Sequence, residues 1–157
     1  MAFIVRLLKR FRFDTILDIG CTDNLLELKL RNKKYLGIDI EPKVKSENIK
    51  KIGLLSMPED KKFDCVLALE VLEHTEDPVA ALNKIKKLTG KYLIISVPYE
   101  PIFTLFRLLV PEKEHMFVIF PWALKEKLGK PIYEKSLVFG RQYLAIWDFS
   151  RDVEKSR

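Results

Sequence analysis

The chain has 157 residues, of which 48 % are hydrophobic and 32 % are charged. This length and balance favour one soluble globular domain over residues 1–157, with a core of its own. No apolar run approaches the length that spans a bilayer, and the N-terminus lacks the small-residue cleavage site of a secretory signal. Two cysteines, Cys21 and Cys65, are too few for a disulfide framework or a zinc site. We therefore expect a cytoplasmic protein without a transmembrane segment.

The net charge is +6. A basic balance favours anionic partners such as RNA, acidic lipid surfaces or phosphorylated substrates. The lysines are scattered in pairs and are not interleaved with aromatic residues, so most of them are expected to be solvated surface groups.

Residues 1–13 have the spacing of an amphipathic helix. Such a helix either packs on the sheet or covers a ligand cleft, or it binds a membrane surface or a partner through the basic face that Arg6, Lys9 and Arg10 would form. The sequence leaves these alternatives open.

Residues 15–40 are predicted to form a strand, a turn, a short helix and a second strand. Thr15–Ile19 is an apolar run with one acid, Gly20 follows where the chain must turn, and Tyr35–Ile40 is apolar with Asp39 near its end. In open parallel sheets, ligands bind beyond the carboxyl ends of the strands. A carboxylate there can accept hydrogen bonds from the two hydroxyls of a ribose. This stretch therefore predicts half of a site for an adenosine-containing ligand.

After Asp39 the chain is too short for a full crossover helix before a third strand, which is expected within Ile49–Leu55. Phe63–Leu69 is a near-continuous apolar run and predicts the fourth strand. Asp77 and Pro78 predict the start of a helix over Val79–Leu88.

Gly90 is expected to end that helix, and Tyr92–Val97 to form the fifth strand. Trp122–Leu128 is predicted to be helical, and Ile132–Phe139 and Gln142–Phe149 to form a strand pair. Residues 101–111 are almost entirely apolar. They predict a segment buried against the domain or against a second protein copy or partner, or a lid over a lipophilic substrate.

Three segments, ILDIGC, YLGIDI and FDCVLALEVLEH, resemble the class I S-adenosylmethionine (SAM) dependent methyltransferases, in their small type 11 form, which is similar to the ubiquinone and menaquinone methyltransferases. The resemblance implies an α/β, Rossmann-like fold: a mostly parallel seven-stranded sheet with a C-terminal antiparallel pair, in a three-layer αβα sandwich. It also implies SAM as the cofactor.

The resemblance assigns a cofactor role to eight positions. The turn on the methionine side is Asp18, Gly20, Cys21 and Thr22; Asp39 holds the ribose; Ile40 and Leu55 lie beside the adenine; and Glu70 borders the methyl-transfer end. The chain departs from the family where Thr22 and Asn24 replace glycines, and no acid stands at residues 53–55 to contact the adenine amino group.

Glu70, Glu73 and His74 are spaced i, i+3 and i+4, which predicts that they share one side of a helical turn. With His115 they resemble the divalent-metal site of small-RNA 2′-O-methyltransferases, in which the metal helps to deprotonate an acceptor hydroxyl. In the alternatives without metal, His74 is the catalytic general base, or it orients the substrate or caps a helix.

The sequence therefore favours an enzyme that transfers the methyl group of SAM to an oxygen, nitrogen or carbon acceptor, most readily a lipophilic or aromatic small molecule. The alternatives are an RNA methyltransferase with a divalent metal, and a non-catalytic domain that binds another protein.

Overall fold

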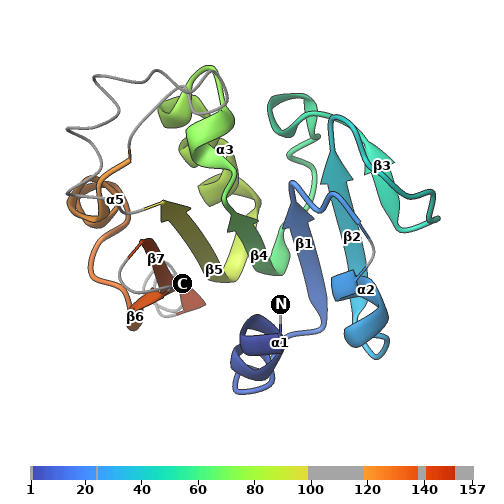
Figure 1. Ribbon diagram of the computed structural model, residues 1–157, viewed down its shortest axis with the longest axis horizontal. Helices are drawn as coiled ribbons and strands as arrows, with labels where there is room; N and C mark the ends of the chain where they lie inside the picture. The colour runs from blue at the N-terminus through green and yellow to red at the C-terminus, as the bar shows by residue number, and fades with distance from the viewer. Residues whose placement is uncertain (1, 24, 99–118, 138–140, 151–157) are drawn as a thin grey trace.

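A computed structural model describes residues 2–23, 25–98, 119–137 and 141–150. Seven strands form one sheet in the order β3-β2-β1-β4-β5-β7-β6 (Figure 1). The first five strands pair in parallel, and β7 pairs antiparallel with both β5 and β6. The mostly parallel sheet with an antiparallel C-terminal pair is thus confirmed.

An α-helix connects β1 to β2 and β4 to β5, as in βαβ units, and a 3-10 turn lies between β3 and β4. In chain order the elements are α1 (Ala2–Leu8), β1 (Thr15–Ile19), α2 (Leu25–Lys29), β2 (Lys34–Asp39), β3 (Ile49–Lys51), η1 (Leu54–Ser56), β4 (Phe63–Leu69), η2 (Leu72–His74), α3 (Pro78–Leu88), β5 (Thr89–Pro98), α5 (Pro121–Leu128), β6 (Tyr133–Leu137) and β7 (Gln142–Asp148). None of the described helices is long and apolar enough to cross a membrane.

Two hydrophobic cores lie on opposite faces of the sheet. Successive side chains of a strand point to opposite faces, so Leu17 of β1 belongs to the core under α3 and α5, while Ile16 belongs to the core under α1 and α2. The apolar side of α1 is buried in this second core. The structure therefore has the predicted three layers, with α1 packed against the sheet.

The second crossover contains no helix. Residues 40–48 are all described, and they return from β2 to the short β3 as turns and bends (Figure 1). This agrees with the expectation from the short spacing between Asp39 and Ile49.

The expectation that Gly90 ends α3 is wrong. The helix ends at Leu88, and β5 begins immediately at Thr89. A Cβ on Gly90 would lie 3.0 Å from the carbonyl oxygen of Phe63. The glycine therefore serves the close approach of β5 to β4.

Candidate active site

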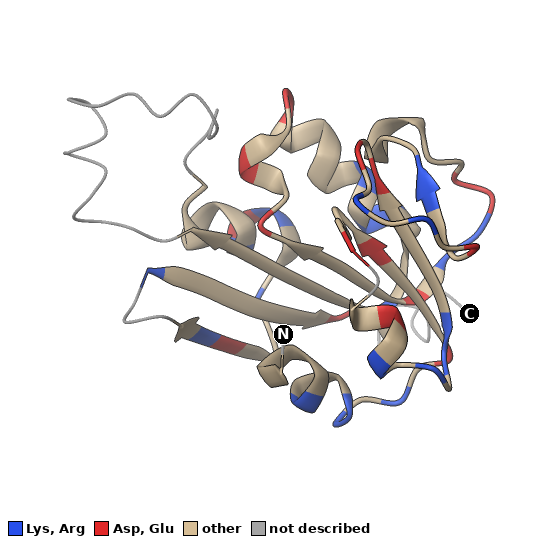
Figure 2. Ribbon diagram, turned by 45° about the vertical axis from the view of Figure 1, so that its right-hand side comes forward, with Lys and Arg blue, Asp and Glu red and all other residues tan. Residues whose placement is uncertain are grey.

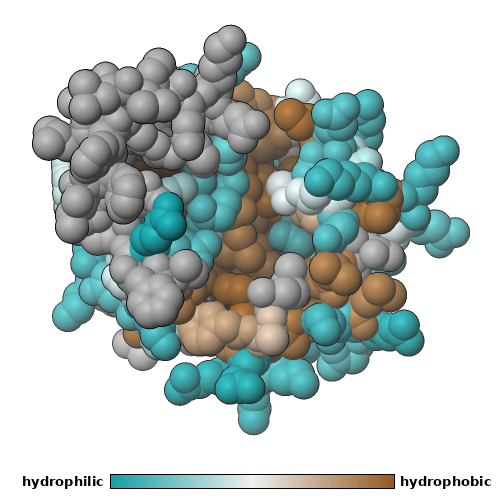
Figure 3. Space-filling view, viewed as in Figure 1, coloured by the Kyte–Doolittle hydropathy of each residue, from teal (hydrophilic) through white to brown (hydrophobic). Residues whose placement is uncertain are grey.

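The carboxyl ends of β1, β2 and β4 meet at one edge of the sheet, which holds most of the predicted site. The chain leaves β1 toward β2 on one side, and β4 lies on the other side of β1. The strand order therefore reverses between β1 and β4, and such switch points are where open α/β sheets bind ligands. In the space-filling view, hydrophobic atoms form a hollowed band in the middle of the molecule, over β4 between α3 and α1 (Figure 3).

The turn after β1 is held in a left-handed conformation. Gly20 has a φ of 71°, and its backbone N–H donates to the carbonyl of Ile38 at 2.8 Å. A Cβ on Gly20 would lie 2.8 Å from Cγ2 of Val71, so the turns after β1 and β4 are in close contact. Thr22 also has a positive φ, 47°, at a position where the family pattern has glycine. Its side chain therefore adopts a backbone that ordinarily favours glycine.

Asp39 links this turn to the end of β2. Its Oδ2 accepts a hydrogen bond from the backbone N–H of Thr22 at 3.0 Å, and its Oδ1 accepts one from Glu41 at 2.7 Å. The backbone N–H of Lys43 donates to the carbonyl of Thr22 at 2.8 Å. The predicted ribose carboxylate is thus half-buried and fixed in place by backbone donors.

Asp18 lies beneath the turn. Its side chain is only 7 % exposed, and its Oδ2 accepts a hydrogen bond from the Tyr35 hydroxyl at 2.8 Å. Burial raises its pKa to about 7, against the lowering effect of this bond. Cys21 is also buried, and burial raises the pKa of its thiol to about 12. These two residues therefore lie on the core side of the turn.

Two exposed apolar residues lie just after β2 and within η1. Ile40 is 74 % exposed and Leu55 is 56 % exposed. A Cβ on Gly53, which immediately precedes η1, would lie 3.6 Å from Cγ2 of Ile40, so the end of β2 and the start of η1 are neighbours. They offer apolar surface at the position that the resemblance assigns to the adenine.

Glu70 follows β4 with a φ of 56°. Its Oε1 accepts hydrogen bonds from the Ser96 hydroxyl at 2.8 Å and from Nε2 of Gln142 at 3.0 Å. One carboxylate oxygen thus joins the ends of β4, β5 and β7. Neither Ser96 nor Gln142 was predicted to lie at this site, although Ser96 is the one polar residue in the apolar run YLIISV.

The prediction that Glu70, Glu73 and His74 share one side of a helical turn is wrong. The helical segment is a 3-10 turn that begins at Leu72, and Glu70 precedes it in a left-handed conformation. Glu73 is buried, whereas His74 is exposed. Among the described residues, no three His, Cys, Asp or Glu lie close enough to hold a metal ion. His115 and residues 101–111 lie outside the described residues, so the predictions made for them stay predictions.

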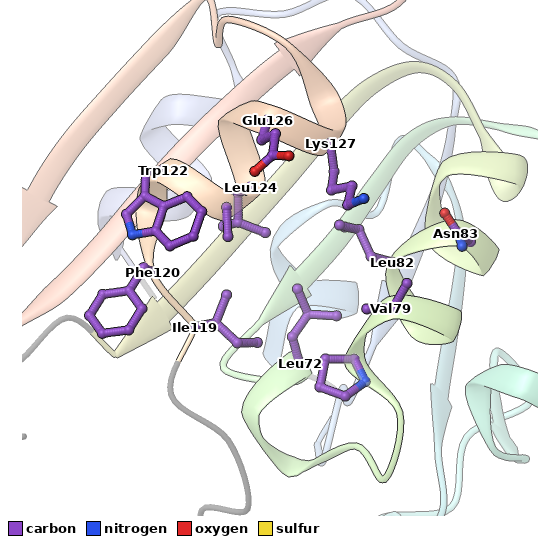
Figure 4. Close-up of a pocket in the computed structure, with 12 residues that line it drawn as sticks. Leu72, Val79, Leu82, Asn83, Ile119, Phe120, Trp122, Leu124, Glu126 and Lys127 are labelled. Carbon is purple, nitrogen blue, oxygen red and sulfur yellow. The ribbon is translucent and has the colours of Figure 1, made fainter.

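A pocket of about 520 Å³ opens between α3 and α5 (Figure 4). Leu72, Val79 and Leu82 line one side of it, and Ile119 and Trp122 face them from the other. Polar groups are few among the residues that line the pocket; they are Asn83, Glu126 and Lys127. Because Leu72 comes two residues after Glu70, the pocket begins close to the end of β4.

Comparison with known proteins identifies the family of this chain. The sequence profile of the methyltransferase domain matches residues 1–130. No curated protein matches the sequence at a significant level.

The fold is similar to that of several solved methyltransferases. The magnesium protoporphyrin IX methyltransferase of Synechocystis PCC 6803, crystallised with S-adenosylhomocysteine (SAH), has a TM-score of 0.73 at 17 % identity, over 94 % of this chain and 80 % of that chain. The N-methyltransferase NodS of Bradyrhizobium japonicum WM9 has a TM-score of 0.69 at 16 % identity, over 94 % and 92 %. A putative methyltransferase in complex with the Haloferax volcanii Trm112 activator has a TM-score of 0.66 at 14 % identity, over 92 % and 87 %.

At these identities the solved structures establish the Rossmann-like methyltransferase fold, and the profile match establishes the family. The match is to the general methyltransferase domain, so the narrower type 11 resemblance stays a prediction. The chain belongs to the methyltransferase domain family and is an enzyme of the SAM-dependent methyltransferase class.

Proposed function

We propose that this chain transfers the methyl group of SAM to an oxygen, nitrogen or carbon atom of a small acceptor with an apolar or aromatic body. The main support for an apolar acceptor is the apolar pocket between α3 and α5. Its volume of about 520 Å³ lies in the range of small-molecule sites, roughly 300–1,000 Å³. An apolar acceptor also agrees with the type 11 resemblance.

The described residues fit the cofactor. Each carboxylate oxygen of Asp39 accepts one backbone N–H and keeps a second lone pair, so the pair of oxygens can still accept the two ribose hydroxyls. Ile40 and Leu55 supply apolar walls for adenine in place of the acid that the family often has. SAM, when bound, supplies a methyl group that its own positive sulfonium activates.

The task left to the protein is positioning. The turns after β1 and β4 are close together at Gly20 and Val71, and the bonds from Ser96 and Gln142 fix Glu70 at the end of β4. Holding two reactants in line removes much of the entropic part of the barrier. No general base is required for an acceptor that is already nucleophilic, and His74 stays a predicted base for acceptors that are not.

A methyl-transfer assay with a panel of aromatic and alkyl alcohols and amines tests this proposal. Val79 and Trp122 are 59 % and 64 % exposed, so Val79→Asp and Trp122→Asp change the pocket with little cost in folding. We expect each to raise KM for the acceptor about tenfold, or ~1.4 kcal/mol, and to leave the Kd for SAM unchanged.

Ile132→Asp is the matched control, because Ile132 is 55 % exposed and lies outside the pocket. Equal KM values for all three variants and the parent would contradict the assignment of the pocket to the acceptor.

A further inference from the structure

One side of the sheet carries a dense group of positive charges. Residues 31–51 contain seven Lys or Arg and three Asp or Glu, a net charge of +4, which equals that of residues 1–13. Residues 31–51 include β2 and the edge strand β3. Figure 2, with the β2–β3 side turned forward, shows basic residues on β3 and at the start of β2.

Six of these seven cations are exposed and have no ion-pair partner within the described parts of the chain. We call them the basic edge: Arg31, Lys34, Lys43, Lys45, Lys50 and Lys51. The seventh, Lys33, lies 4.0 Å from Asp14. Elsewhere several lysines are paired: Lys84 and Lys87 with Glu59, Lys91 with Asp64, and Lys125 with Glu134.

Protection of the exposed sheet edge against pairing with another chain does not explain all six cations of the basic edge. Lysines on an edge strand deter pairing with another chain, and this explains Lys50 and Lys51 of β3. The other four cations lie outside β3, before or at the start of β2 and in the connection between the strands. Together they follow the edge over the length of β2, which is about 20 Å for six residues at ~3.3 Å each.

The surroundings of the basic edge distinguish between anionic partners. Ile40, at the tip, is the only large exposed hydrophobic residue in 31–51, and the apolar side of α1 is buried in the core. Apart from Ile40, the edge therefore lacks the apolar face that enters a bilayer in interfacial binding. Tyr35 is the only aromatic residue in this range, and it is buried, so no side chain is available to stack on bases.

We propose that the basic edge binds the phosphate backbone of a duplex nucleic acid without reading its sequence. Each strand of a duplex places a phosphate every ~3.4 Å of the helix axis, so an edge of about 20 Å along the axis spans about six phosphates of one strand. Contacts to phosphates fix position and carry no sequence information. This interaction is separate from the acceptor pocket, which lies on the α3–α5 side of the molecule.

Fluorescence anisotropy with a labelled, mixed-sequence RNA duplex tests the proposal. The edge variant is the triple change Lys34→Glu, Lys45→Glu and Lys50→Glu. The matched control is Lys62→Glu, Lys86→Glu and Lys130→Glu, which gives the same net charge from exposed lysines elsewhere. Since none of the six lines the cofactor site, SAM binding by both variants should equal that of the parent, which separates failure here from failure of the proposed function.

We expect the parent to bind the duplex with an affinity that falls with salt. The edge variant should bind at least tenfold more weakly, and the slope of log K against log salt should decrease by about three, at ~0.9 for each lost phosphate contact. The control should stay near the parent. Equal weakening in both variants, or no binding by the parent, would overturn the proposal. So would edge-dependent binding to phosphatidylglycerol vesicles in the absence of duplex binding.

Discussion

The carboxylate of Asp39 accepts a hydrogen bond from the backbone N–H of Thr22, with Oδ2 and N 3.0 Å apart. This bond joins the end of β2 to the turn after β1, the two parts of the chain to which the resemblance assigns the ribose and the methionine of SAM. It also supports a threonine in a left-handed conformation that costs of order 1 kcal/mol or more. The predicted cofactor site is therefore held together by a hydrogen bond within the chain itself.

Asp18 should make the stability of the protein depend on pH. Its pKa of about 7 lies above the ordinary 3.8, so the folded state holds this proton more tightly than the unfolded chain does. Its contribution is therefore present below pH ~4 and is lost as pH rises through ~7. Asp18→Asn removes this loss and should exceed the parent in stability by on the order of 4 kcal/mol above pH ~8.

Chemical denaturation of both proteins across this pH range measures the difference. The hydrogen bond from Tyr35 lowers the pKa of Asp18. Tyr35→Phe should therefore shift the loss of stability to higher pH. Parallel stability curves for the parent and Asp18→Asn would show that Asp18 is ionised at neutral pH in the folded protein.

Gly20→Ala should destabilise the protein by about 1–3 kcal/mol. The new Cβ would meet Cγ2 of Val71 at 2.8 Å, at a backbone φ of 71°. Val71→Ala in the same chain removes the clash but not the backbone cost, so the double variant should recover part of the loss. Gly53→Ala is the control, since its Cβ would lie 3.6 Å from the nearest side chain and its φ is −74°. Urea denaturation of the four proteins would contradict this account if Gly20→Ala and Gly53→Ala cost the same.

The hydrogen bond from Ser96 to Glu70 should appear as a coupling energy. Ser96 is 1 % exposed, and its hydroxyl donates to a carboxylate, a type of bond worth about 1.5–3 kcal/mol. Ser96→Ala should therefore destabilise the parent by that amount and cost much less in a Glu70→Ala background. A double-mutant cycle measures the coupling. Additive losses would mean that the bond contributes nothing to stability.

The elements with local signals were predicted closely. The bounds of β1 and β4 match the apolar runs, because strands buried on both faces need apolar residues at every position. The start of α3 was predicted because Asp77 does cap it, accepting from the N–H groups of Val79 and Ala80 at 3.0 and 2.9 Å.

The predictions that were wrong concern residues whose roles depend on neighbours distant in sequence. Gly90 reads as a helix end, but its role is set by the carbonyl of Phe63 across the sheet. The spacing of Glu70, Glu73 and His74 predicts a shared face only if the segment is an α-helix, and the left-handed turn at Glu70 separates them. The partners of Glu70 come from β5 and β7, and no local pattern connects those strands to it.

In the function proposed for this chain, Asp39 at the end of β2 holds the cofactor. Calorimetry of SAM binding to the parent, Asp39→Ala and Ile40→Asp tests it most directly. Ile40 is 74 % exposed, so its substitution changes the adenine wall without a cost in folding, whereas Asp39→Ala needs a melting curve beside it. We predict SAM binding by the parent, at least tenfold weaker binding by Ile40→Asp, and loss of binding by a folded Asp39→Ala. Unchanged affinity in both variants, or no binding by the folded parent, would contradict the account.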